Sequence, residues 1–201
     1  MPDLTAYARI LPRLRRKVFV SYFRGDKAEV ETFVNTWGYL YGLFIPSIAG
    51  ACGNEVINSE NAEYVIGRIR REQIADSTVT MLLLGSCTHS RRHVDWDIKA
   101  SLRQGEDCKP NGLLGIVLPS QGNWPQLPER FAQNWNTSGN CYARYYSAPT
   151  SAYDLAWWIE DAYFARENRA QLIKNSAEIM GYNIRCRICN VTHSIRDTNP
   201  P

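Results

Sequence analysis

Residues 77–101 read STVTMLLLGSCTHSRRHVDWDIKAS, and this stretch decides the fold. Its first part, 78–84, is an apolar run typical of a buried strand. A Gly-Ser-Cys-Thr loop follows, and then 90–103 has the spacing of a helix that carries Asp97. In open α/β sheets, ligands bind just beyond the carboxyl ends of the strands. The stretch therefore places a carboxylate, several hydroxyl groups and two arginines where such a fold binds its ligand.

Strand-like and helix-like patterns alternate along the rest of the chain. The expected strands are 17–22, 39–46, 78–84, 112–118 and 141–147. The expected helices are 27–37, 62–74, 90–103 and 152–169, with one more beyond 171. Such alternation is typical of a parallel sheet with helices on both faces. We therefore expect one α/β domain at 17–170, with a flavodoxin-like, doubly wound parallel sheet of about five strands. Residues 1–16 are the expected N-terminal lead-in, and 171–201 the expected C-terminal helix and tail.

Length, charge and hydropathy limit the classes of protein to consider. The 201 residues carry a net charge of +3, which is too small to argue for nucleic acid. No window approaches the ~18 apolar residues of a membrane span, and the N-terminus lacks the apolar core of a signal peptide. We expect a cytoplasmic protein with neither nucleic acid nor membrane among its partners.

The six cysteines are expected to be reduced thiols, as is usual in the cytoplasm. Cys186 and Cys189 form a CxxC motif that His193 follows. A zinc site needs four ligands at usable spacing, and a second CxxC motif is missing. The motif therefore favours a tail helix with incidental thiols over a metal site.

Polar and aromatic side chains gather where two of the expected strands end. After 17–22 and 78–84 these are Ser21, Tyr22, Phe23, Arg24, Ser86, Thr88, Arg91 and Asp97. Aromatic rings can stack on a nucleotide base, and arginine can pair with a pyrophosphate. A carboxylate can stabilise the oxocarbenium-like transition state of glycosidic cleavage. These residues therefore suit a nucleotide whose glycosidic bond is broken.

The two aspartates of the expected helix 90–103 differ in position. At about 100° per residue, an inward stripe forms from Val94, Ile98 and Leu102. Asp97 borders this stripe and is expected to be half buried. Asp95 falls on the wetter side, where a surface pair with Lys99 is expected. Asp97 is thus the candidate for chemistry, although capping the helix or forming a salt bridge would also explain it.

Motifs of other nucleotide sites are missing from the sequence. No GxGxxG motif or P-loop occurs, which disfavours hydride transfer and P-loop phosphoryl transfer. An FMN site is also disfavoured, because the loop after 17–22 holds Phe23, Arg24 and Asp26 in place of small residues. Asp26 instead fits a helix N-cap. His89 and His93 are expected to be structural or exposed.

Two motifs, KVFVSY at 17–22 and TVTMLLLGSCTHSRRHVDWDIKAS at 78–101, resemble the TIR-like domain of the Thoeris antiphage protein ThsB and its relatives. The resemblance implies a TIR-like fold and cleavage of NAD at the nicotinamide–ribose bond. The implied product is a cyclic ADP-ribose-type second messenger, made after a phage-derived trigger, that activates a separate effector. NAD is then the substrate, and neither a bound cofactor nor a metal is expected.

The resemblance also assigns residues. The family's catalytic glutamate falls on Asp97, and the aromatic residue of its motif falls on His93. The expected NAD contacts are Ser21, Tyr22, Phe23, Arg24, Ser86 and Arg91. Aspartate retracts the carboxylate by roughly 1.5 Å relative to glutamate, and a misplacement of about 1 Å can cost about a hundredfold in rate.

A non-catalytic TIR-like interaction module is therefore the alternative. The loop aromatics Trp124 and Trp135 would serve such a module if they are exposed. Self-assembly is expected through the loop 47–60, by analogy with TIR domains.

Overall fold

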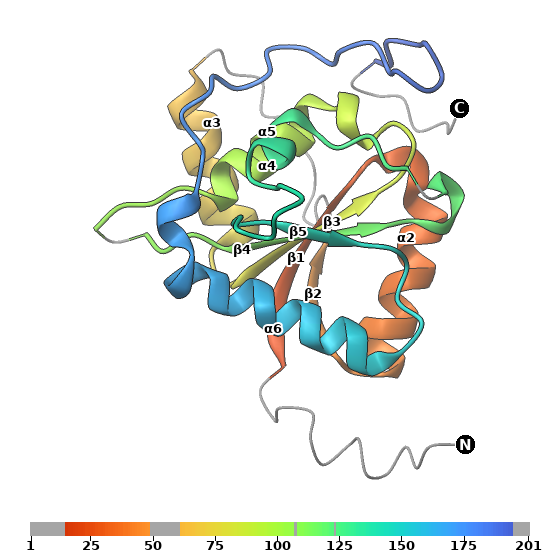
Figure 1. Cartoon of the computed structure of the whole chain (residues 1–201). Helices are drawn as coiled ribbons and strands as arrows, with labels where there is room; N and C mark the ends of the chain where they lie inside the picture. The colour runs from red at the N-terminus through yellow and green to blue at the C-terminus, as the bar shows by residue number, and fades with distance from the viewer. Residues whose placement is uncertain (1–14, 49–60, 107, 123, 195–201) are drawn as a thin grey trace.

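Five parallel strands form the centre of the computed structural model, which describes residues 15–48, 61–106, 108–122 and 124–194 (Figure 1). The strands are β1 (Arg16–Tyr22), β2 (Phe44–Ile48), β3 (Val79–Leu84), β4 (Gly112–Val117) and β5 (Arg144–Tyr146). Their order in the sheet is β2-β1-β3-β4-β5, and every pairing is parallel. This is the order of a flavodoxin-like, doubly wound sheet, so the predicted fold class is confirmed.

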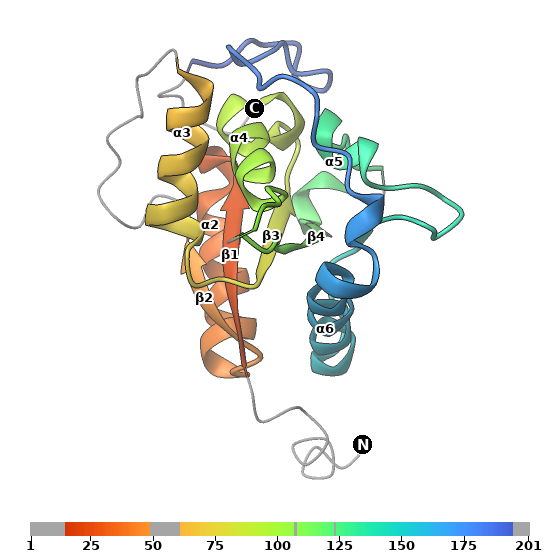
Figure 2. The ribbon, with the colours of Figure 1, turned by 90° about the vertical axis from the view of Figure 1, so that its left-hand side faces the viewer.

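Helices cover both faces of the sheet (Figure 2). One face carries α2 (Lys27–Phe33) and α6 (Ala152–Asn168), and the other carries α3 (Ala62–Ile69), α4 (Arg92–Ser101) and α5 (Glu129–Gln133). Short helical turns are η1 (Arg24–Asp26), η2 (Val34–Leu40), η3 (Arg70–Ile74), η4 (Thr88–Ser90), η5 (Pro119–Gln121) and η6 (Ala170–Leu172). In the described ranges, no helix combines the length and the apolar composition that crossing a bilayer demands.

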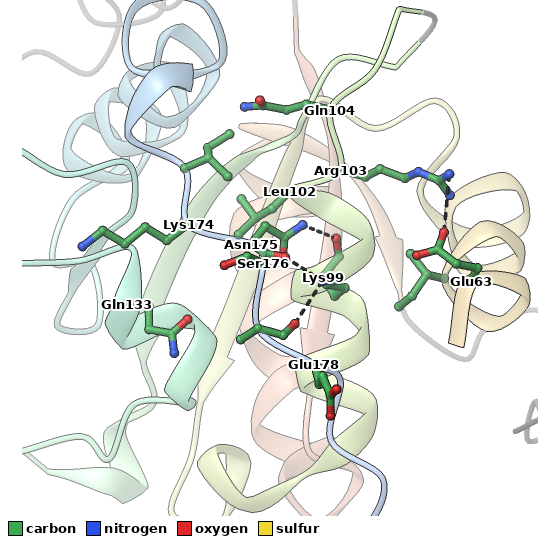
Figure 3. A pocket seen from close by; sticks show the side chains of 13 residues that line it. Glu63, Lys99, Leu102, Arg103, Gln104, Gln133, Lys174, Asn175, Ser176 and Glu178 are labelled. Atoms are coloured by element: carbon green, nitrogen blue, oxygen red, sulfur yellow. Dashed lines mark hydrogen bonds and ion pairs between the residues drawn. The ribbon is translucent and has the colours of Figure 1, made fainter. Parts of the chain in front are cut away.

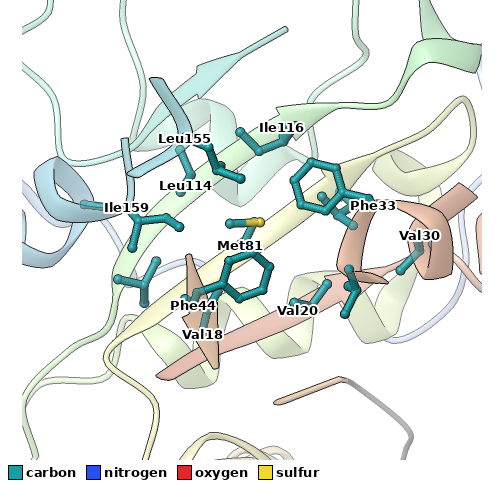
Figure 4. Packing of buried hydrophobic residues seen from close by; sticks show 14 of the residues in the cluster. Val18, Val20, Val30, Phe33, Phe44, Met81, Leu114, Ile116, Leu155 and Ile159 are labelled. Carbon is teal, nitrogen blue, oxygen red and sulfur yellow. The ribbon is translucent and has the colours of Figure 1, made fainter. Parts of the chain in front are cut away.

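The hydrophobic core has a layer on each face of the sheet. Successive side chains of a strand point to opposite faces. Val18 and Val20 of β1 therefore join the layer under α2 and α6, where Met81 lies near the middle (Figure 4). Phe19 packs in the other layer, against α3 and α4. The same alternation turns Ser21, two residues after Phe19, toward α4.

The helix after β1 is longer than predicted. It continues through the π-helical turn η2 to Leu40, and β2 begins only at Phe44, so the predicted strand 39–46 starts too early. Trp37 stacks on Tyr41 with ring centres 5.1 Å apart, and Gly42 then turns the chain with a φ of 63°. Glycine adopts this left-handed conformation without strain. The apolar side chain of Leu40 is exposed, so the apolar run did not mark a buried strand.

The C-terminal segment, defined here as residues 173–194, contains no helix, so the helix predicted beyond 171 is wrong. After η6 the segment runs as irregular chain past α4 (Figure 2). Lys99 Nζ donates to the carbonyl oxygens of Asn175 and Ala177 at 2.6 and 3.0 Å, and Trp96 Nε1 donates to that of Met180 at 2.8 Å. Side chains of α4 thus satisfy backbone groups that a helix would otherwise have paired.

Other boundaries lie close to the predictions. The first strand begins at Arg16, one residue before the predicted start at 17. The Arg16 side chain donates to both carboxylate oxygens of Glu160 at 2.8 and 2.9 Å. Trp124 is exposed as expected, whereas Trp135 packs against Tyr145 with ring centres 5.1 Å apart. Most of the loop proposed for self-contact, 49–60, lies outside the described residues.

β4 approaches α6 closely at Gly112. A Cβ at this position would overlap the backbone carbonyl of Ala162, which cannot rotate away as a side chain could. We expect Gly112→Ala to lower the free energy of unfolding by about 2 to 3 kcal/mol, measured by urea denaturation. Gly181→Ala is the control, since its Cβ would meet nothing within 4 Å. Equal unfolding midpoints for the two variants would contradict this packing.

Candidate functional site

Asp97 of α4 lies against the end of β1. Ser21 Oγ donates a hydrogen bond to Asp97 Oδ2 at 2.7 Å, and both side chains are buried. Burial raises the pKa of the Asp97 carboxyl to about 7, and the hydrogen bond from Ser21 opposes this only in part. Near neutral pH the group is therefore present both as the acid and as the carboxylate. Two residues chosen from the sequence are thus brought into direct contact.

The sheet fixes the direction in which Asp97 points. Val94 and Ile98 pack into the core as predicted, and one turn after Asp97 the hydroxyl of Ser101 pairs with that of Thr80 at 2.6 Å. This face of α4 packs against the sheet, and Asp97 is only 4% exposed. The expectation of a half-buried carboxylate was therefore wrong in degree.

His93 closes the same strand end from one turn earlier on α4. Its Nε2–H donates to the carbonyl oxygen of Tyr22 at 3.1 Å. Burial lowers the pKa of His93 to about 4, so the ring is neutral at pH 7 and keeps this donor. Tyr22 is partly buried, and Arg24 is exposed beside it. His93 therefore ties α4 to the end of β1.

Asp26 is a second carboxylate at these strand ends, and sequence reasoning assigned it only a capping role. It occupies the N-cap position of α2, but its side chain caps nothing there. It lies instead against Gly85, where any Cβ would overlap Asp26 Oδ2. That oxygen is buried without a hydrogen-bond partner among the described residues. Burial, and then the charge of Glu29, raise the pKa of Asp26 to about 6, although Thr88 and Arg91 oppose the rise.

Phe23 and Arg91, both expected to contact NAD, contact each other. The guanidinium carbon of Arg91 lies 4.0 Å from the centre of the Phe23 ring. Both side chains are buried, Arg91 at 1% exposure and Phe23 at 2%. Arg91 Nε donates to the carbonyl oxygen of Cys87 at 3.2 Å. Its two terminal nitrogens are buried and have no hydrogen-bond partner in the described part of the chain. Ser86 is partly buried in the same loop.

The sequence model of the Thoeris protein ThsB, TIR-like domain, matches residues 19–123, just over half of the chain. The chain belongs to this family. No curated protein matched it. The matched residues run from β1 past the end of β4 and include Ser21, Asp26 and Asp97.

Asp95 of this ThsB TIR-like domain is not the solvated surface charge that the helical wheel predicted. Arg130 of α5 donates to both of its carboxylate oxygens, at 2.8 and 3.2 Å, and the pair is buried. The backbone N–H of Met180 donates to Asp95 Oδ2 at 2.9 Å. The predicted partner, Lys99, bonds to the C-terminal segment instead. The correction arises because α5 and this segment cover the side of α4 that the wheel left open to water.

A groove of about 940 Å³ lies between the C-terminal half of α4, α3 and the C-terminal segment (Figure 3). Polar side chains line much of it, including Glu63, Lys99, Arg103 and Glu178. An ion pair of 3.6 Å joins Arg103 to Glu63 across one side. Neither Asp97 nor any of the expected NAD contacts lines this groove, so it is separate from the carboxylate.

Cys186 and Cys189 do not lie on the predicted tail helix, since the C-terminal segment is irregular there. The C-terminal segment brings Cys186 Sγ to 3.4 Å and Cys189 Sγ to 3.6 Å from Cys87 Sγ. His193 Nε2 lies 3.1 Å from Cys189 Sγ. His89, whose pKa is lowered by burial, accepts a hydrogen bond from the backbone N–H of Arg187 at 3.1 Å. The cluster could not be predicted from the sequence, because Cys87 lies about a hundred residues before the CxxC motif.

Proposed function

We propose that this chain is a TIR-like enzyme of Thoeris antiphage defence that cleaves NAD at the nicotinamide–ribose bond. Its product would be a cyclic ADP-ribose-type messenger that activates a separate effector after a phage-derived trigger. The observation that carries the proposal is the buried carboxylate of Asp97 at the ends of β1 and β3, within the residues that match the family. In a doubly wound sheet this is the edge at which ligands bind.

The chemistry needs a negative charge near the ribose and little else. When the bond between ribose C1′ and the nicotinamide nitrogen breaks, its electron pair neutralises the pyridinium ring, so the leaving group needs no proton. Positive charge then develops on C1′ and the ring oxygen, and a carboxylate shielded from water stabilises it strongly. Asp97 has this role, and Ser21 positions it by holding Oδ2.

The surface of the same strand ends supplies the nucleotide contacts in this proposal. Tyr22, Arg24 and Ser86 keep exposed surface there. An aromatic ring and an arginine suit a base and a pyrophosphate, respectively. Phe23 and Arg91 support this surface from the interior. If a nucleophile within the ADP-ribose moiety captures C1′, the product is cyclic, and burial favours this by keeping water away.

One observation favours the non-catalytic alternative. Asp97 is 4% exposed, so a substrate must displace a covering group to reach it. An interaction module would not need that access, and it would keep Asp97 only for its bond to Ser21.

Mass spectrometry of nucleotides from cells expressing the chain, before and after phage challenge, tests the proposal. We expect an ADP-ribose-derived species on infection, and we expect Asp97→Asn to abolish it together with protection. Asp76→Asn is the matched control, because that carboxylate is 77% exposed and its ion pair with Lys17 lies at the surface. Full protection in the Asp97→Asn strain without any new nucleotide would support the interaction module instead.

A further inference from the structure

Four metal-binding side chains converge where the C-terminal segment meets the loop between β3 and α4. The sulfur atoms of Cys87, Cys186 and Cys189 and the Nε2 atom of His193 are joined by contacts of 3.1 to 3.6 Å. The donor atoms of Cys87, Cys189 and His193 all lie within 4.8 Å of one another. A tetrahedral zinc ion with Zn–S bonds of about 2.3 Å holds its sulfurs about 3.8 Å apart. The two sulfur–sulfur contacts, 3.4 and 3.6 Å, are therefore within a few tenths of an ångström of that value. Cys186 joins the other three residues through its contact with Cys87.

The backbone around the CxxC motif is folded to present its thiols. The N–H of Cys186 donates to the carbonyl of Val191 at 2.9 Å, and that of Asn190 donates to the carbonyl of Cys186 at 3.0 Å. Asn190 adopts a left-handed φ of 60°, which reverses the chain between Cys189 and His193. The N–H of Ile188 points at Cys186 Sγ from 3.4 Å. Such N–H groups stabilise a thiolate, which is the form that binds a metal.

The charge around the cluster also fits a bound cation with three thiolates. Three cysteinate ligands and one neutral histidine give a zinc centre one net negative charge. Arg91 lies beside Cys87, is 1% exposed, and has two terminal nitrogens without a hydrogen-bond partner among the residues that are described. A buried guanidinium is costly unless an opposite charge lies near it. The carboxyl of Asp26 lies near Arg91 and supplies part of that charge, and an anionic metal centre would add to it.

We propose that Cys87, Cys186, Cys189 and His193 form a structural Cys₃His zinc site that fastens the C-terminal segment to the loop between β3 and α4. All four positions are filled by protein, which is the pattern of a structural rather than a catalytic zinc ion. Sulfur and imidazole ligands favour zinc over magnesium or calcium. Three of the four ligands lie after residue 123, beyond the part of the chain that matches the family.

The position of the site gives it a consequence for the strand ends. The His193 ring meets Phe23 edge to face at 5.5 Å, and Phe23, Cys87 and Cys186 form one buried cluster. A metal ion here would hold the loop that precedes α4, and with it the helix that carries Asp97. This inference does not depend on NAD cleavage, because an interaction module would need the same loop in place.

Elemental analysis of the full chain, produced in zinc-supplemented medium and purified without chelators, is the direct test. We expect about one zinc ion per chain. The zinc content should fall at least about tenfold in Cys189→Ser and in His193→Gln, because a structural site needs all four ligands. Cys108→Ser is the control, since that thiol donates to the carbonyl of Arg103, away from the cluster, and its loss should leave the zinc content unchanged.

A second readout does not require the variants to fold. Replacing zinc by cobalt(II) in the wild-type chain should give the absorption bands of a tetrahedral thiolate site. Wild-type chain that contains no zinc, and whose intact mass shows a disulfide between two of these cysteines, would overturn the proposal. The same conclusion would follow if Cys189→Ser kept the wild-type zinc content.

Discussion

The Asp97→Asn variant is expected to lose its NAD-cleaving activity by about 100- to 1,000-fold and yet to gain stability relative to the wild type as the pH rises. The gain follows from the environment of the carboxyl. Burial raises its pKa from 3.8 to about 7 in the folded chain. Burying the Asp97 carboxylate therefore lowers the stability of the wild type, whereas the neutral amide of Asp97→Asn carries no charge to bury.

The pH dependence has a definite sign. Between pH 3.8 and about 7 the folded state holds the Asp97 proton that the unfolded state has released. Within that range, each unit of rising pH removes about 1.4 kcal/mol from the free energy of unfolding. Above the folded pKa both states are ionised, and the loss stays constant. The stability of Asp97→Asn relative to the wild type should therefore increase by about 3 kcal/mol between about pH 5 and about pH 8.

Urea denaturation of both proteins at the two pH values measures this change. Any fixed cost of the buried amide group appears at both pH values and cancels in the comparison. Asp76→Asn again serves as the control, because it makes the same chemical change at an exposed carboxylate. A constant difference between Asp97→Asn and the wild type would mean that Asp97 is already ionised at about pH 5.

Much of this fold could be predicted from local patterns. The apolar runs of β3 and β4 and the alternation of β1 are properties of neighbouring residues, and they located the central strands. The helical wheel likewise placed Asp97 beside the inward stripe of α4. The strand predicted at 39–46 was wrong because its first apolar residues belong to the end of a π-helical turn. In the sequence, Gly42 was the sign that the chain turns after it.

The remaining features of the site depend on contacts between distant segments. Burial raises the pKa of Asp26, and no local pattern reveals that its carboxylate lies against Gly85. The cysteine cluster needs Cys87 from the loop after β3 and three ligands from the C-terminal segment. The helical wheel erred on Asp95 because it considered α4 alone, whereas α5 and the C-terminal segment bury that side of the helix.

The buried pair of Asp95 and Arg130 leads to the opposite expectation from Asp97. Asp95→Asn should lower the free energy of unfolding by about 3 to 5 kcal/mol, because it leaves the Arg130 guanidinium buried without its counter-charge. Both residues also hold the C-terminal segment. Arg130 donates to the carbonyl oxygens of Ala177 and Glu178 at 3.1 and 2.8 Å, and Asp95 accepts from the N–H of Met180.

Two measurements separate this role from a merely local one. Urea denaturation gives the loss of stability, and amide hydrogen exchange across 173–184 reports whether the C-terminal segment detaches before the sheet unfolds. In Asp95→Asn, we expect the Met180 amide to exchange faster than in the wild type. In Asp97→Asn, we expect it to exchange at the wild-type rate. The same chemical change two residues apart on one helix should thus destabilise the chain at Asp95 and stabilise it at Asp97 at about pH 8. A loss below about 1 kcal/mol in Asp95→Asn would show that water reaches Arg130, as it does in exposed ion pairs.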